Sequence, residues 1–192
     1  MKFLGTLVLV VLLAQIGVRA QQSLSPNSPP ARNPVSSSIK ERLEDQSKNF
    51  VAGAEFMPAG GYNFKPALGM MDFGQLMFHV ADTNYGLCSS IAGASAPAVN
   101  VTGADPKDKQ VLNLRRSFEF CRSALARVDD SRLGEGVSFF GEKLISRADA
   151  LITLSDDWND HYAAQAIYLR LNGILPPTAR PQLKKISNGP FS

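Results

Sequence analysis

The chain has little histidine and cysteine, and it lacks the short motifs of several common enzyme classes. Its 192 residues contain two histidines and two cysteines. It has no glycine-rich phosphate loop, no serine nucleophile elbow and no Cys-x-x-Cys pair. Each of these motifs is needed for its own chemistry. Their absence argues against a P-loop nucleotide-binding protein, an α/β-hydrolase and a thioredoxin-like redox protein.

The start of the chain predicts export. Lys2 supplies a positive charge, an almost wholly apolar run covers residues 3–18, and the small residue Ala20 follows. This order is typical of a secretory signal peptide over residues 1–20, cleaved after Ala20. The alternative is an uncleaved membrane anchor, but the apolar run is near the lower limit for spanning a bilayer. We expect a secreted or periplasmic protein with no stable membrane insertion after cleavage.

Positive charge is sparse in the mature chain. Removal of Lys2 and Arg19 with the signal peptide lowers the formal net charge from +3 to +1, and no cluster of Lys and Arg remains. Nucleic-acid-binding proteins carry a basic patch or stripe. We therefore expect no nucleic-acid partner.

The mature chain is long enough for one domain, and its patterns predict helices. Residues 21–37 are rich in Gln, Ser, Asn and Pro and predict a disordered tether. Apolar periodicity predicts four helices, over about residues 38–56, 72–93, 106–128 and 143–172. No segment alternates for long enough to predict a sheet. The expected fold class is all-α, a four-helix bundle over residues 38–178 followed by a loose tail, residues 179–192.

The expected helix boundaries rest on capping residues. Ser38 begins a capping box and Asp72 begins another, whereas Asp105 precedes a proline at the first position of a helix. Gly93 and Gly173 are the expected stops of the second and fourth helices.

The two histidines and one aspartate are the candidate metal ligands. His79 lies on the inward side of the second predicted helix, and Asp157 precedes His161 by four residues on the fourth. Residues spaced by four share a helix face, so together the three would form a divalent-metal site with an open position. The alternatives are a hydrogen-bonded core histidine and a solvated acidic face.

The two cysteines have two interpretations. Cys88 lies 16 residues after Asp72, and Cys121 lies 15 residues after Pro106. Parallel neighbouring helices would hold both at nearly equal depth, within reach of a disulfide in an oxidising compartment. Otherwise they are two small buried apolar residues.

Two strings of the sequence resemble the DinB-like family of four-helix proteins. The string from Phe73 to Asp82 (FGQLMFHVAD) is similar to the family's second helix. The His-Tyr pair at 161–162, the string YLRLNGI at 168–174 and the prolines at 176–177 resemble the end of its fourth helix. The resemblance covers about residues 38–178.

The resemblance implies an up-down-down-up bundle whose second and third helices are parallel. It also implies a divalent metal, commonly zinc or nickel, held by one histidine of the second helix and two of the fourth. His79 matches the first of these and His161 the last, whereas Asp157 occupies the middle position. Two histidines and a carboxylate can still bind zinc, nickel, manganese or iron.

The resemblance implies two functions. Relatives include transferases and isomerases that use low-molecular-weight thiols, so one expectation is a metal-dependent thiol transferase or a hydrolase-like enzyme with a thiol or other small-molecule substrate. The other is a non-catalytic binding or structural bundle with a degenerate metal site. Export favours the second, because cytoplasmic thiol cofactors are scarce outside the cell. A homodimer is compatible with either.

Overall fold

The computed structural model describes residues 31–141 and 143–180. The predicted signal peptide, most of the predicted tether and residues 181–192 of the predicted tail lie outside the described residues. In the described part of the chain, no helix combines the length and apolar character that crossing a bilayer requires.

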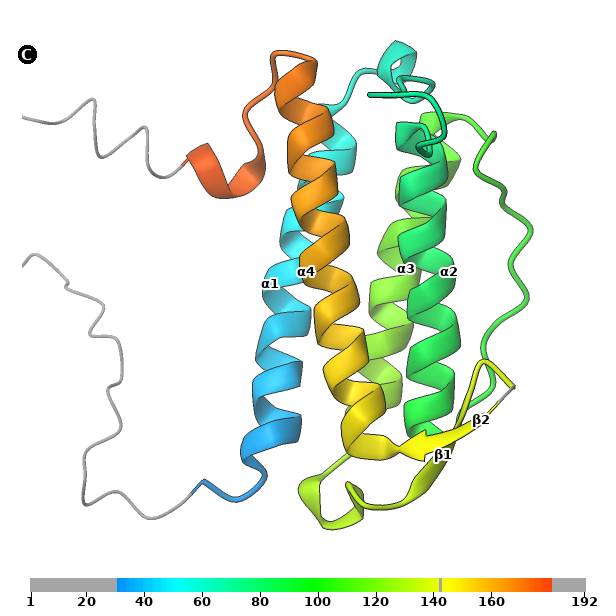
Figure 1. The fold of residues 1–192 in the computed structure, drawn as a ribbon, viewed down its shortest axis with the longest axis vertical. Coiled ribbons are helices and arrows are strands. Elements are labelled where there is room, and N and C mark those ends of the chain that lie inside the picture. Colours follow the sequence, from blue (N-terminus) through cyan, green and yellow to red (C-terminus); the bar gives the residue numbers. More distant parts are fainter. Residues whose placement is uncertain (1–30, 142, 181–192) are drawn as a thin grey trace, which may run out of the picture. The chain divides into compact units, whose positions relative to one another are not determined.

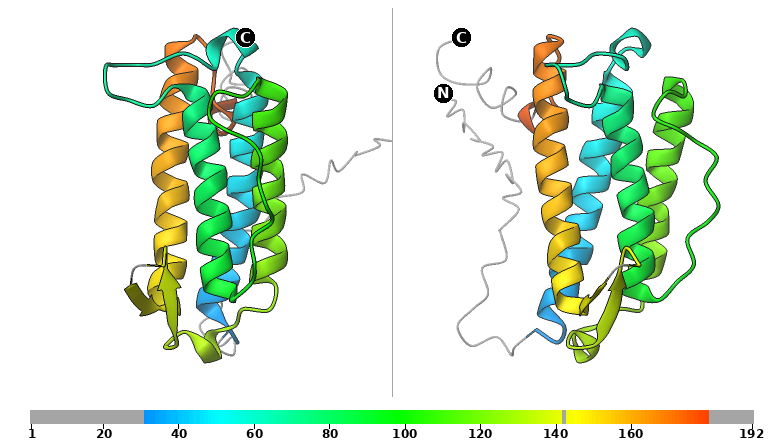
Figure 2. Two further views of the ribbon diagram at one scale, coloured as in Figure 1. Left: turned by 90° about the vertical axis from the view of Figure 1, so that its right-hand side faces the viewer. Right: turned by 45° about the vertical axis from the view of Figure 1, so that its right-hand side comes forward.

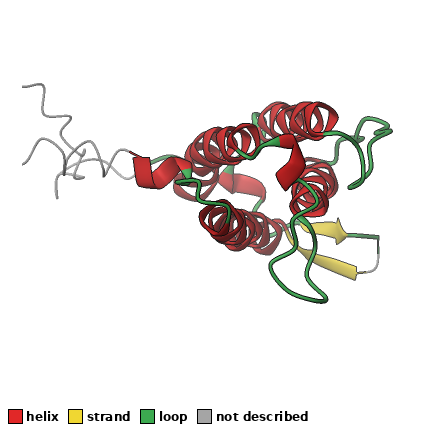
Figure 3. Ribbon diagram, turned by 90° about the horizontal axis from the view of Figure 1, so that it is seen from above, coloured by secondary structure: helices red, strands yellow, loops and turns green. Residues whose placement is uncertain are grey.

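Four long helices make up the body of the domain, and the all-α prediction is confirmed for that body (Figure 1). They are α1 (Pro34–Phe56), α2 (Phe73–Ala92), α3 (Lys107–Leu125) and α4 (Arg147–Leu171). Short 3₁₀ turns occupy Ala59–Gly61, Asp130–Arg132 and Pro177–Ala179. Viewed along their axes, the four helices surround a common core (Figure 3).

The course of the chain places α2 beside both α3 and α4. In Figure 1, α1 and α4 run upward, whereas α2 and α3 both run downward. The connection over residues 93–106 returns along the length of the bundle, as Figure 2 shows. Helix α2 packs most extensively on α3 and also contacts α4. This arrangement places the candidate ligands of α4 beside α2.

Local sequence signals set both ends of α2 and the C-terminal end of α4 as predicted. The backbone N–H of Gln75 donates to the Asp72 carboxylate at 2.8 Å, and the Gln75 side chain accepts from the Asp72 N–H at 2.9 Å. Gly93 and Gly173 follow the two helices with φ of 64° and 71°. Glycine adopts this left-handed conformation without the strain a Cβ would add.

The first helix begins one turn earlier than its predicted capping box. Ser38 lies inside α1, where its hydroxyl donates to the carbonyl of Pro34 at 2.8 Å. The backbone N–H groups of Val35 and Ser36 instead donate to the carboxylate of Asp130, at 2.9 and 2.8 Å. The assignment of residues 34–37 to the tether was therefore wrong, because a distant residue caps the helix.

A small hairpin precedes α4, so the prediction of no sheet was wrong. Strands β1 (Gly136–Phe139) and β2 (Lys143–Ser146) pair antiparallel, with Val137 opposite Ile145. Four-residue strands are too short for a readable alternation. Helix α4 consequently starts at Arg147, capped by Ser146, rather than at Lys143.

The other two boundary differences are smaller. Helix α3 begins at Lys107 and ends at Leu125, three residues before the predicted end. The carboxylate of Asp105 accepts from Thr102 in the preceding turn instead of capping the helix. In the predicted tail, the Arg180 guanidinium lies 3.5 Å from the centre of the Phe56 ring, so the chain stays packed on α1 to that point.

A polar network in the core ties three helices together. The indole Nε1 of Trp158 on α4 donates to the Asn84 side-chain oxygen on α2 at 2.7 Å. The Asn84 amide donates in turn to the hydroxyl of Ser117 on α3 at 3.0 Å. All three residues are buried, and satisfied buried networks of this kind fix how helices pack.

A disulfide joins the two parallel helices. Cys88 on α2 and Cys121 on α3 are bonded, with their Cα atoms 5.2 Å apart. Both residues are fully buried. The bond therefore links α3 to α2 close to the point where α2 ends and the long connection begins.

Substituting Glu135 with glutamine is expected to weaken the pH dependence of stability in acid. The Glu135 carboxylate accepts from Arg132 and, at 3.0 Å, from the nearly buried Arg147. These contacts lower the pKa of Glu135 from 4.5 to about 2. A carboxylate with a lowered folded-state pKa stabilises the fold above its unfolded pKa, and this contribution is lost as the pH falls.

The measurement is the urea midpoint of the wild type and of Glu135→Gln at pH 7 and at several values between 4.5 and 2. The wild type should lose more stability than the variant across this window. Parallel curves for the two proteins would contradict the assignment.

Candidate metal centre

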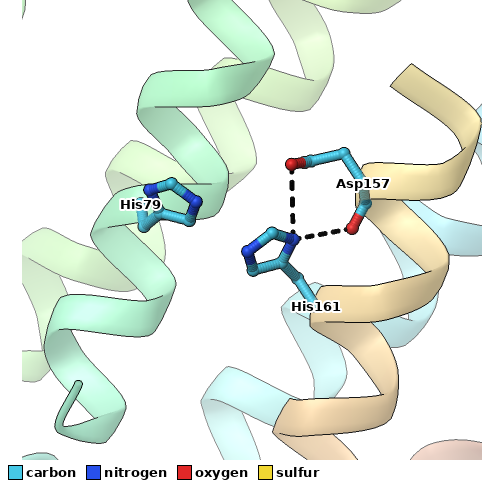
Figure 4. A group of neighbouring side chains, drawn as sticks. All are labelled: His79, Asp157 and His161. Carbon is cyan, nitrogen blue, oxygen red and sulfur yellow. Dashed lines mark hydrogen bonds and ion pairs between the residues drawn. The ribbon is translucent and has the colours of Figure 1, made fainter. Parts of the chain in front are cut away.

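The structure brings His79, Asp157 and His161 together between α2 and α4 (Figure 4). One ligand atom from each residue can be chosen so that all three lie within 4.8 Å of one another. The ring centres of His79 and His161 are 4.7 Å apart. Side chains that reach one cation must converge in this way, because each ligand bond is only about 2.0–2.2 Å long.

Helix geometry selects Asp157 from its acidic neighbours. Asp156 and Asp160 are exposed, so the alternative of a solvated acidic face applies to these two residues. Asp157 faces α2, and only 16% of its side chain is exposed. His161 follows one turn later on the same face, with 19% of its side chain exposed.

The contacts of His161 fix the chemistry of its two ring nitrogens. Nδ1 lies 2.8 Å from the backbone oxygen of Asp157 and 3.3 Å from that residue's carboxylate (Figure 4). A carbonyl oxygen can only accept, so Nδ1 must carry the proton for the first contact to be a hydrogen bond. In the neutral ring, Nε2 then retains its lone pair. Histidines that bind metals commonly have this arrangement, in which the second nitrogen donates to a carbonyl or carboxylate.

One oxygen of the Asp157 carboxylate lacks a hydrogen-bond partner within the described residues. This oxygen, Oδ2, is buried. Burial raises the pKa of Asp157, an effect opposed by the neighbouring His161 and His79 and reinforced by Asp160. A buried carboxylate oxygen without a donor is costly. A cation between this oxygen and the two imidazoles would satisfy it, so the residues present fit a divalent metal.

A pocket beside His79 adjoins the centre. It is lined by the end of the loop before α2 and by the first turns of α2, namely Gly69, Met70, Met71, Gln75, Phe78 and His79. The Tyr168 hydroxyl donates to the carbonyl of Met71 at 2.7 Å and thereby anchors this loop to α4.

Sequence reasoning gave these loop residues no role. Tyr168 entered the sequence analysis only as part of the string at 168–174, and nothing in the spacing of Met70 and Met71 relates them to His79. Their position follows from the long-range hydrogen bond of Tyr168, which no local pattern reveals.

One family model and several solved structures match the chain. A model of the DinB superfamily matches residues 42–164. No protein in a curated collection matches the chain. Solved structures do, at low sequence identity, and they therefore support the fold alone.

Two of these structures are DinB-like proteins of Bacillus. The protein from Bacillus subtilis is 17% identical, with a TM-score of 0.59, and the match covers 71% of this chain and 92% of that one. The protein from Bacillus cereus is 16% identical, with a TM-score of 0.61, and the match covers 73% and 95%. A conserved protein from Enterococcus faecalis is 17% identical, with a TM-score of 0.56, covering 70% and 94%.

Proposed function

Because the chain belongs to the DinB superfamily, we propose that it is an exported metalloprotein that holds one divalent cation at His79, Asp157 and His161. The observation that carries the proposal is the buried, unpartnered Oδ2 of Asp157 beside two converging imidazoles. The course of the helices also supports the family's up-down-down-up topology.

The donor set favours zinc or nickel. Imidazole nitrogens suit both ions, and a single carboxylate is accepted by either. Three protein ligands leave a coordination position for a substrate. A cation there would supply Lewis-acid activation of a thiol or water nucleophile.

The chain's own residues would prepare the site for this role. The Asp157 carbonyl holds the proton on Nδ1 of His161 and orients the ring. The pocket next to His79 offers space for a small molecule. We therefore propose a thiol or another small molecule as the substrate, in a transferase-like or hydrolase-like reaction.

Export is the second part of the proposal. Disulfides persist in oxidising compartments and are rare in the cytosol. The bond between Cys88 and Cys121 therefore supports the secreted or periplasmic location that residues 1–20 predict.

A non-catalytic bundle with a degenerate site is the competing candidate. One observation favours it: the Asp157 carboxylate lies 3.3 Å from Nδ1 of His161, so the two side chains partly satisfy each other without a metal.

Metal binding by the mature protein separates the two candidates. We expect the wild type to bind one equivalent of Zn²⁺ or Ni²⁺ in calorimetric titration. His161→Ala should weaken binding by more than about 100-fold, because even the loss of an outer partner of a ligand costs about 10–100-fold. Asp160→Asn is the matched control, since it removes an exposed carboxylate one residue away, and it should bind as the wild type does.

Asp157→His rebuilds the three-histidine set that the resemblance implies. Metal binding by this variant but not by the wild type would establish the degenerate, non-catalytic bundle. Wild-type binding that His161→Ala leaves unchanged would place the metal elsewhere. Circular dichroism should show that all variants keep the helical fold.

A further inference from the structure

A second cavity lies under the connection between α2 and α3 and shares no lining residue with the metal centre. Residues 93–106 pass along the outside of these helices (Figure 2), and residues 97–101 of this connection line one side of a pocket of about 700 Å³. Small-molecule sites typically measure about 300–1,000 Å³. The cavity is therefore large enough for a ligand.

The walls of this pocket are mainly apolar. Val99 and Val101 of the connection and Leu112 of α3 line it. An aromatic pair, Tyr85 and Phe120, also lines it, with ring centres 5.6 Å apart. Leu112 is 45% exposed. An apolar ligand would remove this surface from water, which is favourable in proportion to the area covered.

One buried polar group interrupts the apolar wall. Asn113 lines the pocket and is only 4% exposed, yet its Nδ2 has no hydrogen-bond partner within the described residues. In the core amide of Asn84, by contrast, the oxygen accepts from Trp158 and the nitrogen donates to Ser117. An unpaired buried amide is costly, so a polar atom of a ligand would bind here with a substantial gain.

The charges that line the pocket favour an anion. Two are basic, Lys109 and Arg116, and one is acidic, Glu119. Lys109 is paired with Asp105 at 3.0 Å. Neither Arg116 nor Glu119 forms an ion pair with a described residue. Arg116 follows Asn113 by three positions and therefore shares its helix face, whereas Glu119 lies one turn further along α3. A carboxylate therefore complements the lining better than an ammonium group.

We propose that this pocket binds an apolar monocarboxylate, such as a medium-chain fatty acid. The hydrocarbon part lies under the connection, between the valines and the aromatic pair. The carboxylate accepts from the Asn113 amide and pairs with Arg116. The site is independent of the proposed metal function.

Calorimetric titration of the mature protein with dodecanoate, below its micelle concentration, tests the proposal. We expect one equivalent to bind. Asn113→Leu and Arg116→Gln should each weaken binding about tenfold or more, because hydrogen bonds to charged groups contribute about 1.5–3 kcal/mol and 1.4 kcal/mol is tenfold. Ala98→Trp, on the connection, should fill the pocket and abolish binding.

Two controls keep the result specific. Arg115→Gln removes the same charge from the neighbouring position of α3, outside the pocket, and should bind as the wild type does. His161→Ala should also leave binding unchanged, which separates this site from the metal centre. Thermal melts should show that the variants remain folded.

Three results would overturn the proposal. The first is no binding of dodecanoate by the wild type, which would indicate that the Asn113 amide donates to an ordered water instead. The second is binding that Ala98→Trp leaves intact. The third is equal affinity for dodecanol or dodecylammonium, which would remove the role of the carboxylate.

Discussion

Replacing Trp158 with alanine is expected to lower the free energy of unfolding by about 3–5 kcal/mol. The side chain has no exposed surface and packs against Phe118, with ring centres 6.1 Å apart. Its removal would leave a cavity at the meeting point of three helices. It would also leave the buried oxygen of Asn84 without its donor.

A second substitution separates the hydrogen bond from the packing. Trp158→Phe keeps an aromatic ring but loses the indole donor, and it should cost about 1–3 kcal/mol for the unpaired oxygen of Asn84. Urea unfolding followed by circular dichroism measures both variants. A loss below about 1 kcal/mol for Trp158→Ala would show that the site collapses around the missing ring.

Removing the disulfide is expected to lower the free energy of unfolding by about 3–4 kcal/mol. Cys88 and Cys121 are separated by 33 positions in sequence, so the bond restricts a sizeable loop of the unfolded chain. The double substitution Cys88→Ala with Cys121→Ala removes the bond without leaving reactive thiols. The midpoint of urea unfolding measures the effect.

Reduction of the wild-type protein is the control for this prediction. The reduced wild type and the double variant should have similar midpoints, both well below that of the oxidised protein. An oxidised protein no more stable than the reduced one would mean that strain in the folded state offsets the loop effect.

The sequence predicted elements whose ends depend on adjacent residues. Helix α2 starts directly after Asp72 because Gln75, three positions on, completes a capping box with it, and it stops before Gly93 because glycine tolerates a left-handed backbone. Such signals need no knowledge of the rest of the chain. They account for the correctly predicted ends of α2 and for the correctly predicted C-terminal end of α4, before Gly173.

The errors fall where distant residues decide the structure. The start of α1 depends on Asp130, which lies 95 positions from Val35. The hairpin before α4 is held by Arg147 and Glu135, and its strands are too short to leave a pattern. Neither arrangement can be inferred from periodicity over a few residues.

The candidate metal centre was predictable in its residues but not in its surroundings. The scarcity of histidine made His79 and His161 conspicuous, and the spacing of four selected Asp157. Nothing in the sequence indicated the loop beside His79, or the unpartnered Asn113 under the long connection, because both depend on how segments far apart in the chain pack together.

The position of Trp158 also gives the protein a built-in optical probe. The chain has no other tryptophan, so its indole emission comes from a single point in the core. That point is adjacent in the chain to Asp157. A paramagnetic ion such as Ni²⁺ bound by the neighbouring side chains should quench this emission, whereas Zn²⁺ should leave it bright. Fluorescence can therefore report occupancy of the centre, and distinguish these two ions, in the unlabelled protein.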